Sequence, residues 1–96
     1  MSDSNGLTRD YRTALLRYLP RREEVALAVG YELGRQGVSK GISLLEIVQV
    51  HHQILAELLA SSPAEEVSDI LEAASCFLVE SLASYEMTQR GLLATE

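Results

Sequence analysis

The stretch SLLEIVQVHHQILAEL at residues 43–58 decides the fold. It opens with Ser43 and, three residues later, Glu46, the spacing of a capping box at a helix N-terminus. Apolar residues then recur every three or four positions, while charged and amide residues take the opposite side, which is typical of an amphipathic helix. The apolar stripe consists of Leu44, Ile47, Val48, His51, Ile54, Leu55 and Leu58. We therefore predict a helix that begins after Ser43.

A similar pattern before this stretch predicts two more helices. The first follows Thr8 as its N-cap, and Pro20 either ends this helix or begins the next, because proline fits a first turn but not a helix interior. Its apolar stripe consists of Leu7, Tyr11, Ala14, Leu15, Tyr18 and Leu19. The second spans residues 21–36 and is stopped by Gly37, so residues 37–41 form a short loop with two glycines.

A fourth helix follows a second capping box, in which Ser62 is the cap, Pro63 is the first helical residue and Glu65 completes the box. No strong helix breaker follows until Gly91, so this helix runs for about 28 residues. With no alternating strand pattern in the chain, the fold class is all-α: an antiparallel four-helix bundle with a long fourth helix. We expect residues 1–6 to be a flexible N-terminal segment and residues 7–94 to form a single helical partner-binding domain.

The composition narrows the function. Of the 96 residues, 47% are apolar, which is ordinary for a folded domain, and the net charge is −6 with the basic residues spread along the chain. Nucleic-acid binding needs a basic face, and an acidic membrane surface repels such a chain, so neither partner is expected. The single cysteine and the polar N-terminus, which lacks a signal-peptide pattern, favour a cytoplasmic protein. The initial Met1 favours a natural start for the chain.

Two of the predicted helices carry more apolar surface than one core contact needs. On the second helix the core face is predicted to hold the stem of Arg22 together with Val25, Ala26, Val29 and Leu33. The opposite face then holds Leu27, Tyr31 and Gly34, flanked by Glu24 and Ala28.

The fourth helix has the same surplus of apolar residues. Its inner stripe is predicted to be Val67, Ile70, Leu71, Ala74, Leu78 and Tyr85, with Phe77 and Leu82 on the margins. Its far side carries Cys76, Val79, Ala83 and Met87. Either both helices are buried on two sides within the monomer, or the extra stripes are interfaces, one for a homodimer and one for a partner.

No catalytic grouping is visible, so we predict no enzymatic activity, no cofactor and no metal site. Cys76 has no neighbouring base and is interpreted as a small core or interface residue. The adjacent His51 and His52 point about 100° apart on a helix and cannot share a metal. His51 lies on the apolar stripe and is predicted to be a hydrogen-bonded core residue, with burial favouring its neutral form. An exposed His52 leaves a phosphotransfer domain as the alternative, although the His-x-x-Lys-Gly pattern of such domains is not matched.

The third and fourth helices resemble a known bacterial family. Residues 46–58 match the pattern E-I-x-x-x-H-x-x-x-L-x-E-L of the N-terminal domain of RsbU-type serine phosphatases. Further matching positions are Tyr11, Leu15, Arg17, Tyr18, Pro63, Glu65, Val67, Tyr85 and Glu86, so the resemblance runs from Tyr11 to Met87. A similar bundle occurs in the C-terminal domain of the clock protein KaiA, which is also a dimer that binds a kinase.

The resemblance implies a homodimeric regulatory domain in a partner-switching pathway of the general stress response. In that family an anti-sigma-type switch serine kinase docks on this domain and activates a linked PP2C-type phosphatase, which leads to release of a sigma factor. The docking surface would involve Glu24 and Ala28 on the second helix and Ser75 and Val79 on the fourth. Combined with the surplus stripes, this adds Leu27 and Tyr31 to the partner site and assigns Cys76, Ala83 and Met87 to the dimer. The family's docking surface is richer in large residues than Ala28 and Ser75 provide.

Overall fold

The computed structural model describes residues 4–94, and side chains within it from residue 6 to residue 92. This part of the chain forms four α-helices and one short 3₁₀ turn, with no strand among the residues described, which confirms the predicted all-α four-helix fold. In chain order they are α1 (Ser4–Tyr18), α2 (Glu24–Ser39), α3 (Leu44–Ala60), η1 (Ala64–Glu66) and α4 (Val67–Ala94). Helix α1 includes residues 4–6 of the segment predicted to precede the domain, and residues 1–3 of that segment lie outside the described residues.

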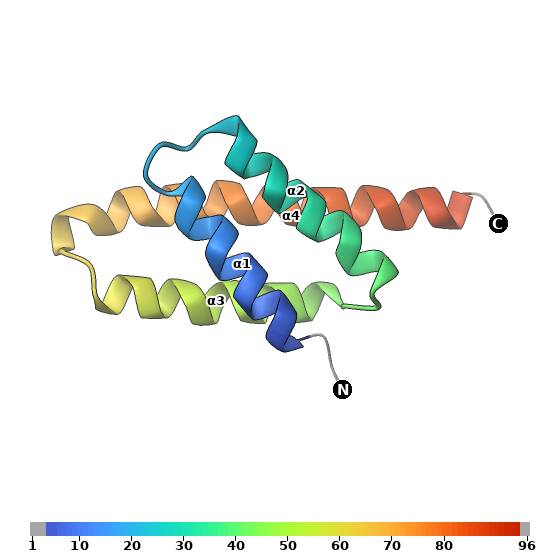
Figure 1. The fold of residues 1–96 in the computed structure, drawn as a ribbon, viewed down its shortest axis with the longest axis horizontal. Coiled ribbons are helices and arrows are strands. Elements are labelled where there is room, and N and C mark those ends of the chain that lie inside the picture. Colours follow the sequence, from blue (N-terminus) through green and yellow to red (C-terminus); the bar gives the residue numbers. More distant parts are fainter. Residues whose placement is uncertain (1–3, 95–96) are drawn as a thin grey trace.

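The helices form two layers. Helices α3 and α4 run antiparallel to each other, and α1 and α2 cross in front of them (Figure 1). Helix α2 lies against α4, and α1 packs against both α2 and α3. The molecule is correspondingly flat and long, at 49 × 30 × 17 Å, and α4 continues beyond the other helices at its C-terminal end.

The ends of the first two helices differ from the prediction. Thr8 lies inside α1, which begins at Ser4, and so is not its N-cap. Helix α2 begins at Glu24 instead of Arg21, because Arg22 adopts a left-handed φ of 52° that no helix interior accepts. The Arg22 guanidinium holds this turn in place: it donates to Glu72 at 2.8 Å and to the Asp69 carbonyl at 2.9 Å.

Gly37 does not stop α2, which continues to Ser39 with Gly37 buried inside it. The chain reverses at Gly41, whose φ of 74° suits glycine. The predicted five-residue loop is therefore reduced to residues 40–43 between α2 and α3. The reversal is tied by a hydrogen bond of 2.9 Å from the Ile42 N–H to the Gly37 carbonyl.

The two predicted capping boxes have different outcomes. Ser43 is the N-cap of α3 and its hydroxyl accepts the Glu46 N–H at 3.1 Å, as predicted. The prediction for Ser62 is wrong, because its hydroxyl turns back and donates to the Leu58 carbonyl at 2.6 Å. The chain passes through Pro63 into η1 without a side-chain cap, and α4 starts at Val67.

The core lies between the two layers and is centred on Tyr11 of α1 and Phe77 of α4. Their rings meet edge to face, with centroids 5.1 Å apart, a favourable aromatic geometry. The remaining buried apolar residues come from α1, α3, α4 and the α2–α3 turn: Leu7, Ala14, Leu15, Tyr18, Ile42, Ile47, Val50, Ile54, Ala73, Ala74 and Tyr85. The predicted stripe of α1 is confirmed, whereas Phe77 is fully buried instead of marginal.

The predicted core face of α2 is right for Ala26 and Leu33, which pack against the core, and wrong for its other members. Val25 is 81% exposed and Val29 is also exposed, while Leu27 packs against the core. Helix α2 contacts α4 through Gly30, Gly34 and Gly37, whose missing side chains let the two backbones come close. The approach is tied by hydroxyls of α4: Ser81 donates to the Gly30 carbonyl at 2.9 Å, and Ser84 to the Tyr31 carbonyl at 2.6 Å.

Three further residues placed on inner stripes by periodicity are exposed in the structure. They are Leu44 and Val48 of α3 and Leu71 of α4. The spacing of apolar residues shows which side of a helix faces the core. It does not show how much of that side the neighbouring helices cover. Leu44 and Val48 lie where α3 and α4 leave an apolar surface open.

Candidate partner-binding surfaces

The predicted far side of α4 is exposed to solvent. Val79 is 63% exposed and Met87 is 60% exposed, and Cys76 and Ala83 are exposed as well. These four residues recur along one face of α4 with spacings of three and four positions, the helical repeat. The structure therefore confirms that α4 carries an apolar stripe that the monomer does not bury.

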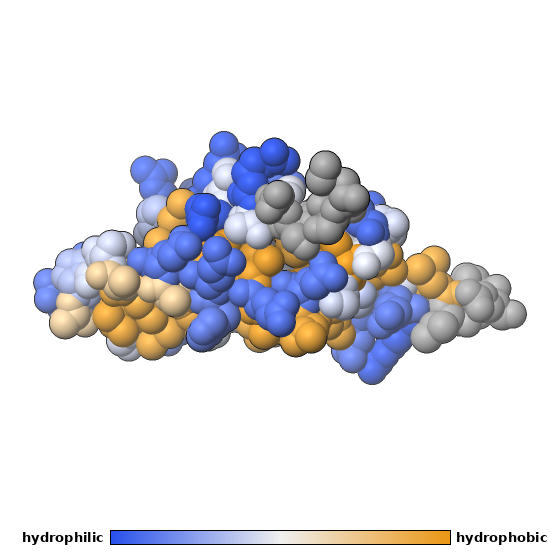
Figure 2. All heavy atoms as spheres, turned by 90° about the horizontal axis from the view of Figure 1, so that it is seen from below, coloured by the Kyte–Doolittle hydropathy of each residue, from blue (hydrophilic) through white to orange (hydrophobic). Residues whose placement is uncertain are grey.

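Val79 and Ala83 form one wall of an open groove between α3 and α4, which we call the α3–α4 groove. It has a volume of about 710 Å³ and is lined by Leu44, Leu45, Val48, Val79, Leu82, Ala83 and Glu86. Figure 2, which views the molecule from the α3 side, shows patches of apolar residues between hydrophilic ones on this side of the surface. Six of the seven lining residues are apolar, so the groove can hold an apolar side chain of another protein.

The sequence analysis missed the α3 wall of this groove. Leu44 and Val48 were assigned to the core, and Leu45, which is 64% exposed, was left unassigned. Leu45 was the available signal: it is a large apolar residue that does not belong to the inner stripe of its helix.

The predicted partner residues of α2 lie on a different part of the surface. Glu24 and Ala28 are exposed, whereas Leu27 and Tyr31 are half-buried. Leu27 packs against the core, which leaves less of it for a partner than predicted. Ser75 is exposed on α4. The groove that Val79 lines is thus completed by α3 and not by these α2 residues.

His51 is a core residue, as predicted. Its Nδ1 lies 2.8 Å from the Tyr11 hydroxyl, and the two rings meet edge to face. Burial lowers the pKa of His51, and the neighbouring His52 lowers it further. Burial also raises the pKa of Tyr11, so its hydroxyl keeps the proton it can donate to His51. His52 is exposed, but Leu55 and Ala56 stand where the phosphotransfer pattern His-x-x-Lys-Gly has lysine and glycine.

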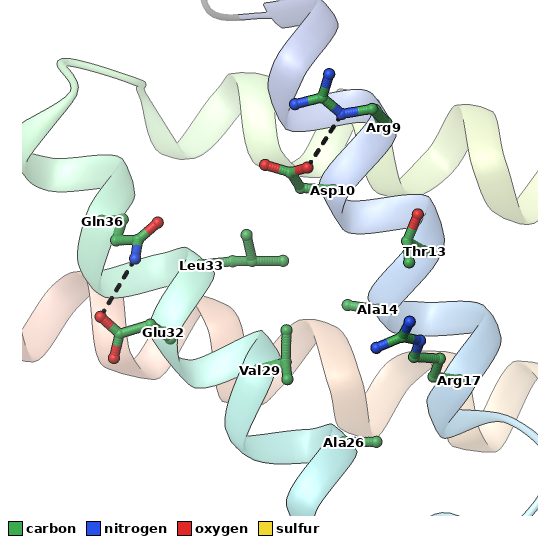
Figure 3. Close-up of a pocket in the computed structure, with 10 residues that line it drawn as sticks. All are labelled: Arg9, Asp10, Thr13, Ala14, Arg17, Ala26, Val29, Glu32, Leu33 and Gln36. Carbon is green, nitrogen blue, oxygen red and sulfur yellow. Dashed lines mark hydrogen bonds and ion pairs between the residues drawn. The ribbon is translucent and has the colours of Figure 1, made fainter.

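A second open surface lies on the other layer, between α1 and α2. It has a volume of about 340 Å³, and its floor includes Ala14, Ala26 and Leu33. Figure 3 shows Arg17 extending from α1 toward α2, while Arg9 is engaged by the adjacent Asp10. Unlike the α3–α4 groove, this cleft combines an apolar floor with charged walls.

A comparison with known families shows the family of the chain. The family model described as the N-terminal domain of phosphoserine phosphatase RsbU matches residues 9–88. The chain belongs to this family. A search of curated proteins found no match, and neither did a search of solved structures.

The RsbU N-terminal match includes every residue proposed above for partner binding or dimerisation, from Glu24 to Met87. RsbU N-terminal domains are the regulatory part of their phosphatases, and no match to a phosphatase catalytic domain was found in this chain. Among residues 4–94, no helix is both long and apolar enough to cross a membrane.

Proposed function

We propose that this RsbU N-terminal domain recruits an anti-sigma-type switch serine kinase in the cytoplasm, within a partner-switching pathway that controls a sigma factor. Docking of the kinase would activate a linked PP2C-type phosphatase. The observation that carries the proposal is the α3–α4 groove, an exposed apolar surface on a domain of a regulatory family. Its volume and lining suit a protein segment that inserts one or two apolar side chains.

Val79 is the proposed anchor for the kinase. It combines high exposure with a position between apolar neighbours on both helices, so a partner that covers it also excludes water from Leu45 and Val48. Burial of one such side chain contributes about 1.5 kcal/mol before the costs of association. Ser75 lies one turn before Val79 on α4 and extends the proposed contact toward the N-terminal half of that helix.

The exposed residues of α2 supply a proposed polar rim. Glu24 and Ala28 are open to a partner, while Leu27 and Tyr31 contribute only their exposed edges. A rim charge such as Glu24 sets orientation and association rate more than it holds the complex together. The kinase contact would therefore be divided between an apolar anchor on α4 and a charged edge on α2.

We also propose that the domain is a homodimer through Cys76, Ala83 and Met87. These residues are exposed on α4 next to the α3–α4 groove, and Ala83 lines the groove as well. An apolar stripe of this length is costly to leave in water on so small a domain. Kinase and second subunit would then occupy neighbouring parts of one helix, and the dimer would help to shape the kinase site.

The experiment is a pull-down of anti-sigma-type serine kinases from the source organism, followed by titration of the purified kinase. Val79→Asp is expected to abolish binding, because the interface would have to desolvate a charge. Ala56→Asp is the matched control, since it adds the same charge to an exposed position of α3 outside the groove. Kinase binding that survives Val79→Asp would remove the groove from the proposal, and failure to capture any such kinase would count against kinase recruitment.

The dimer is tested separately by sedimentation at micromolar concentration. A mass equal to one chain would refute it. Met87→Asp is expected to dissociate the dimer, whereas Val79→Asp should leave it intact. If Val79→Asp dissociates the dimer, the α3–α4 groove belongs to the second subunit instead of to the kinase.

A further inference from the structure

The cleft between α1 and α2 is the middle part of a longer furrow. At one end it adjoins a hollow of about 190 Å³ that reaches Lys40, and the two share Arg9 and Leu33. At the other end it adjoins a hollow of about 380 Å³ that reaches Arg21, and the two share Arg17. We call this continuous surface the α1–α2 furrow. It follows the seam between the two helices and does not include any residue of the α3–α4 groove.

The basic residues of the chain are distributed unevenly around this furrow. Of the eight lysines and arginines, four are arginines that do not line the furrow and that each form an ion pair with a glutamate. These pairs are Arg12–Glu57, Arg22–Glu72, Arg35–Glu32 and Arg90–Glu86. The other four, eight minus four, all line the furrow: Arg9, Arg17, Arg21 and Lys40.

Three of these four cations have no ion-pair partner among the side chains the structure describes. Arg9 is paired with its neighbour Asp10 at 3.2 Å, but Arg17, Arg21 and Lys40 make no ion pair there. The Glu32 carboxylate at the furrow is already engaged by Arg35 and Gln36. In a chain of net charge −6, three cations without an ion pair are thus gathered along one seam, against one such carboxylate, Glu23, in the hollow that Arg21 lines.

The furrow also presents apolar side chains that the monomer does not need for its core. Val25 and Val29 are both exposed on the α2 wall, Val25 at 81%. Ala26 lies between them and packs against the core. An apolar strip flanked by unpaired guanidinium groups is complementary to a segment that carries apolar residues on one side and carboxylates beside them.

We propose that the α1–α2 furrow binds an acidic amphipathic segment of a partner protein. The partner's carboxylates would pair with Arg17 and Arg21, and its apolar side chains would cover Val25 and Val29. A nucleic acid fits less well, because the furrow offers few cations and no aromatic side chain for base stacking. This proposal stands apart from kinase recruitment, since it uses other residues on the other layer of the fold.

The test uses the whole chain and a short fluorescent helical peptide with leucines on one face and glutamates beside them. We expect the peptide to bind with an affinity that falls as salt rises, because the paired charges are screened. Arg17→Ala combined with Arg21→Ala should weaken binding about tenfold, given two partly exposed ion pairs. Arg90→Ala combined with Arg12→Ala removes the same charge outside the furrow and should leave the affinity nearly unchanged.

Chemical-shift mapping of the bound peptide on the labelled chain supplies the second readout, with perturbed amides expected along Arg17 to Val29. The proposal is overturned if a lysine version of the peptide binds equally well, or if the Arg17/Arg21 variant keeps full affinity. It is also overturned if the perturbed amides fall on the α3–α4 groove. If sedimentation shows a dimer that the Arg17/Arg21 variant dissociates, a second copy of the chain covers the furrow instead. None of these outcomes depends on Val79 or on the kinase.

Discussion

Gly34 of α2 lies directly against the backbone carbonyl of Ser81 on α4, so closely that a β-carbon at Gly34 would overlap the oxygen. The β-carbon and the carbonyl oxygen are both fixed by the backbone, so a change of side-chain rotamer cannot relieve the clash. The α2–α4 contact therefore depends on a hydrogen atom at this position.

Gly34→Ala is expected to destabilise the domain by about 1–3 kcal/mol or more, because the two helices must move apart. Gly91→Ala is the matched control: Gly91 also lies in a helix, but nothing stands within contact of an added β-carbon. That change should instead raise stability by up to about 1 kcal/mol. Urea unfolding of both variants checks the pair, and equal effects would contradict the close approach.

The stability of the domain should fall as the pH is lowered through the ordinary pKa of histidine, about 6.5. Burial lowers the pKa of His51 in the folded state, so below this pH the unfolded chain binds a proton that the folded chain resists. The contribution is complete above about pH 6.5 and is lost as the pH decreases toward the lowered pKa of the folded state.

Urea midpoints at about pH 7.5 and about pH 5.5 measure this loss on either side of the ordinary pKa. His51→Gln should remove this part of the pH dependence. His52→Gln should retain most of it, because burial is the larger cause of the shift. A His51→Gln variant that keeps the wild-type pH profile would show that another group is responsible.

The two serines predicted as caps should respond differently to replacement. Ser43→Ala removes the acceptor of the Glu46 N–H and is expected to cost about 1 kcal/mol. Ser62→Ala should cost less, because the Leu58 carbonyl keeps a second donor, the Ser61 hydroxyl at 3.2 Å. Thermal unfolding compares the two variants, and a larger loss for Ser62→Ala would contradict the assignment of the α3 cap.

Glu24→Lys is expected to weaken binding of the proposed kinase in a salt-dependent manner. The residue is exposed in the first turn of α2, so its charge acts mainly on the rate of association. Glu65→Lys makes the same charge change in the first turn of η1 and is the control. Association rates at low and high salt provide the measurement, and equal slowing by both variants would reduce the effect to net charge.

Much of this fold could be predicted from the sequence because its helices are amphipathic and its turns are marked. The stripe of α1, the Ser43 cap and the buried His51 all follow from residue spacing. The face of α2 could be predicted in this way only in part, for Ala26 and Leu33. A hydrophobic pattern scores side chains, and α2 meets α4 through glycines, so its closest contact has the weakest apolar signal.

The candidate surfaces were predictable in part for a related reason. The exposed stripe with Val79 and Met87 follows from the surplus of apolar residues on one helix. Which neighbour completes the groove depends on how helices cross, and this is not written in the spacing of one helix. The pattern of α3 alone therefore does not show that Leu45 and Val48 line a groove, because the opposite wall comes from α4.

A contact made by backbone against backbone also restricts how the sequence can change over evolutionary time. At an ordinary core position, a substitution to a larger side chain on one helix can be compensated by a substitution to a smaller side chain on the helix opposite. Gly34 faces a carbonyl group that every amino acid carries, so no substitution at Ser81 could make room for it. The α2–α4 seam can thus drift only by moving a whole helix, while the charged and apolar residues around it remain free to adapt to new partners.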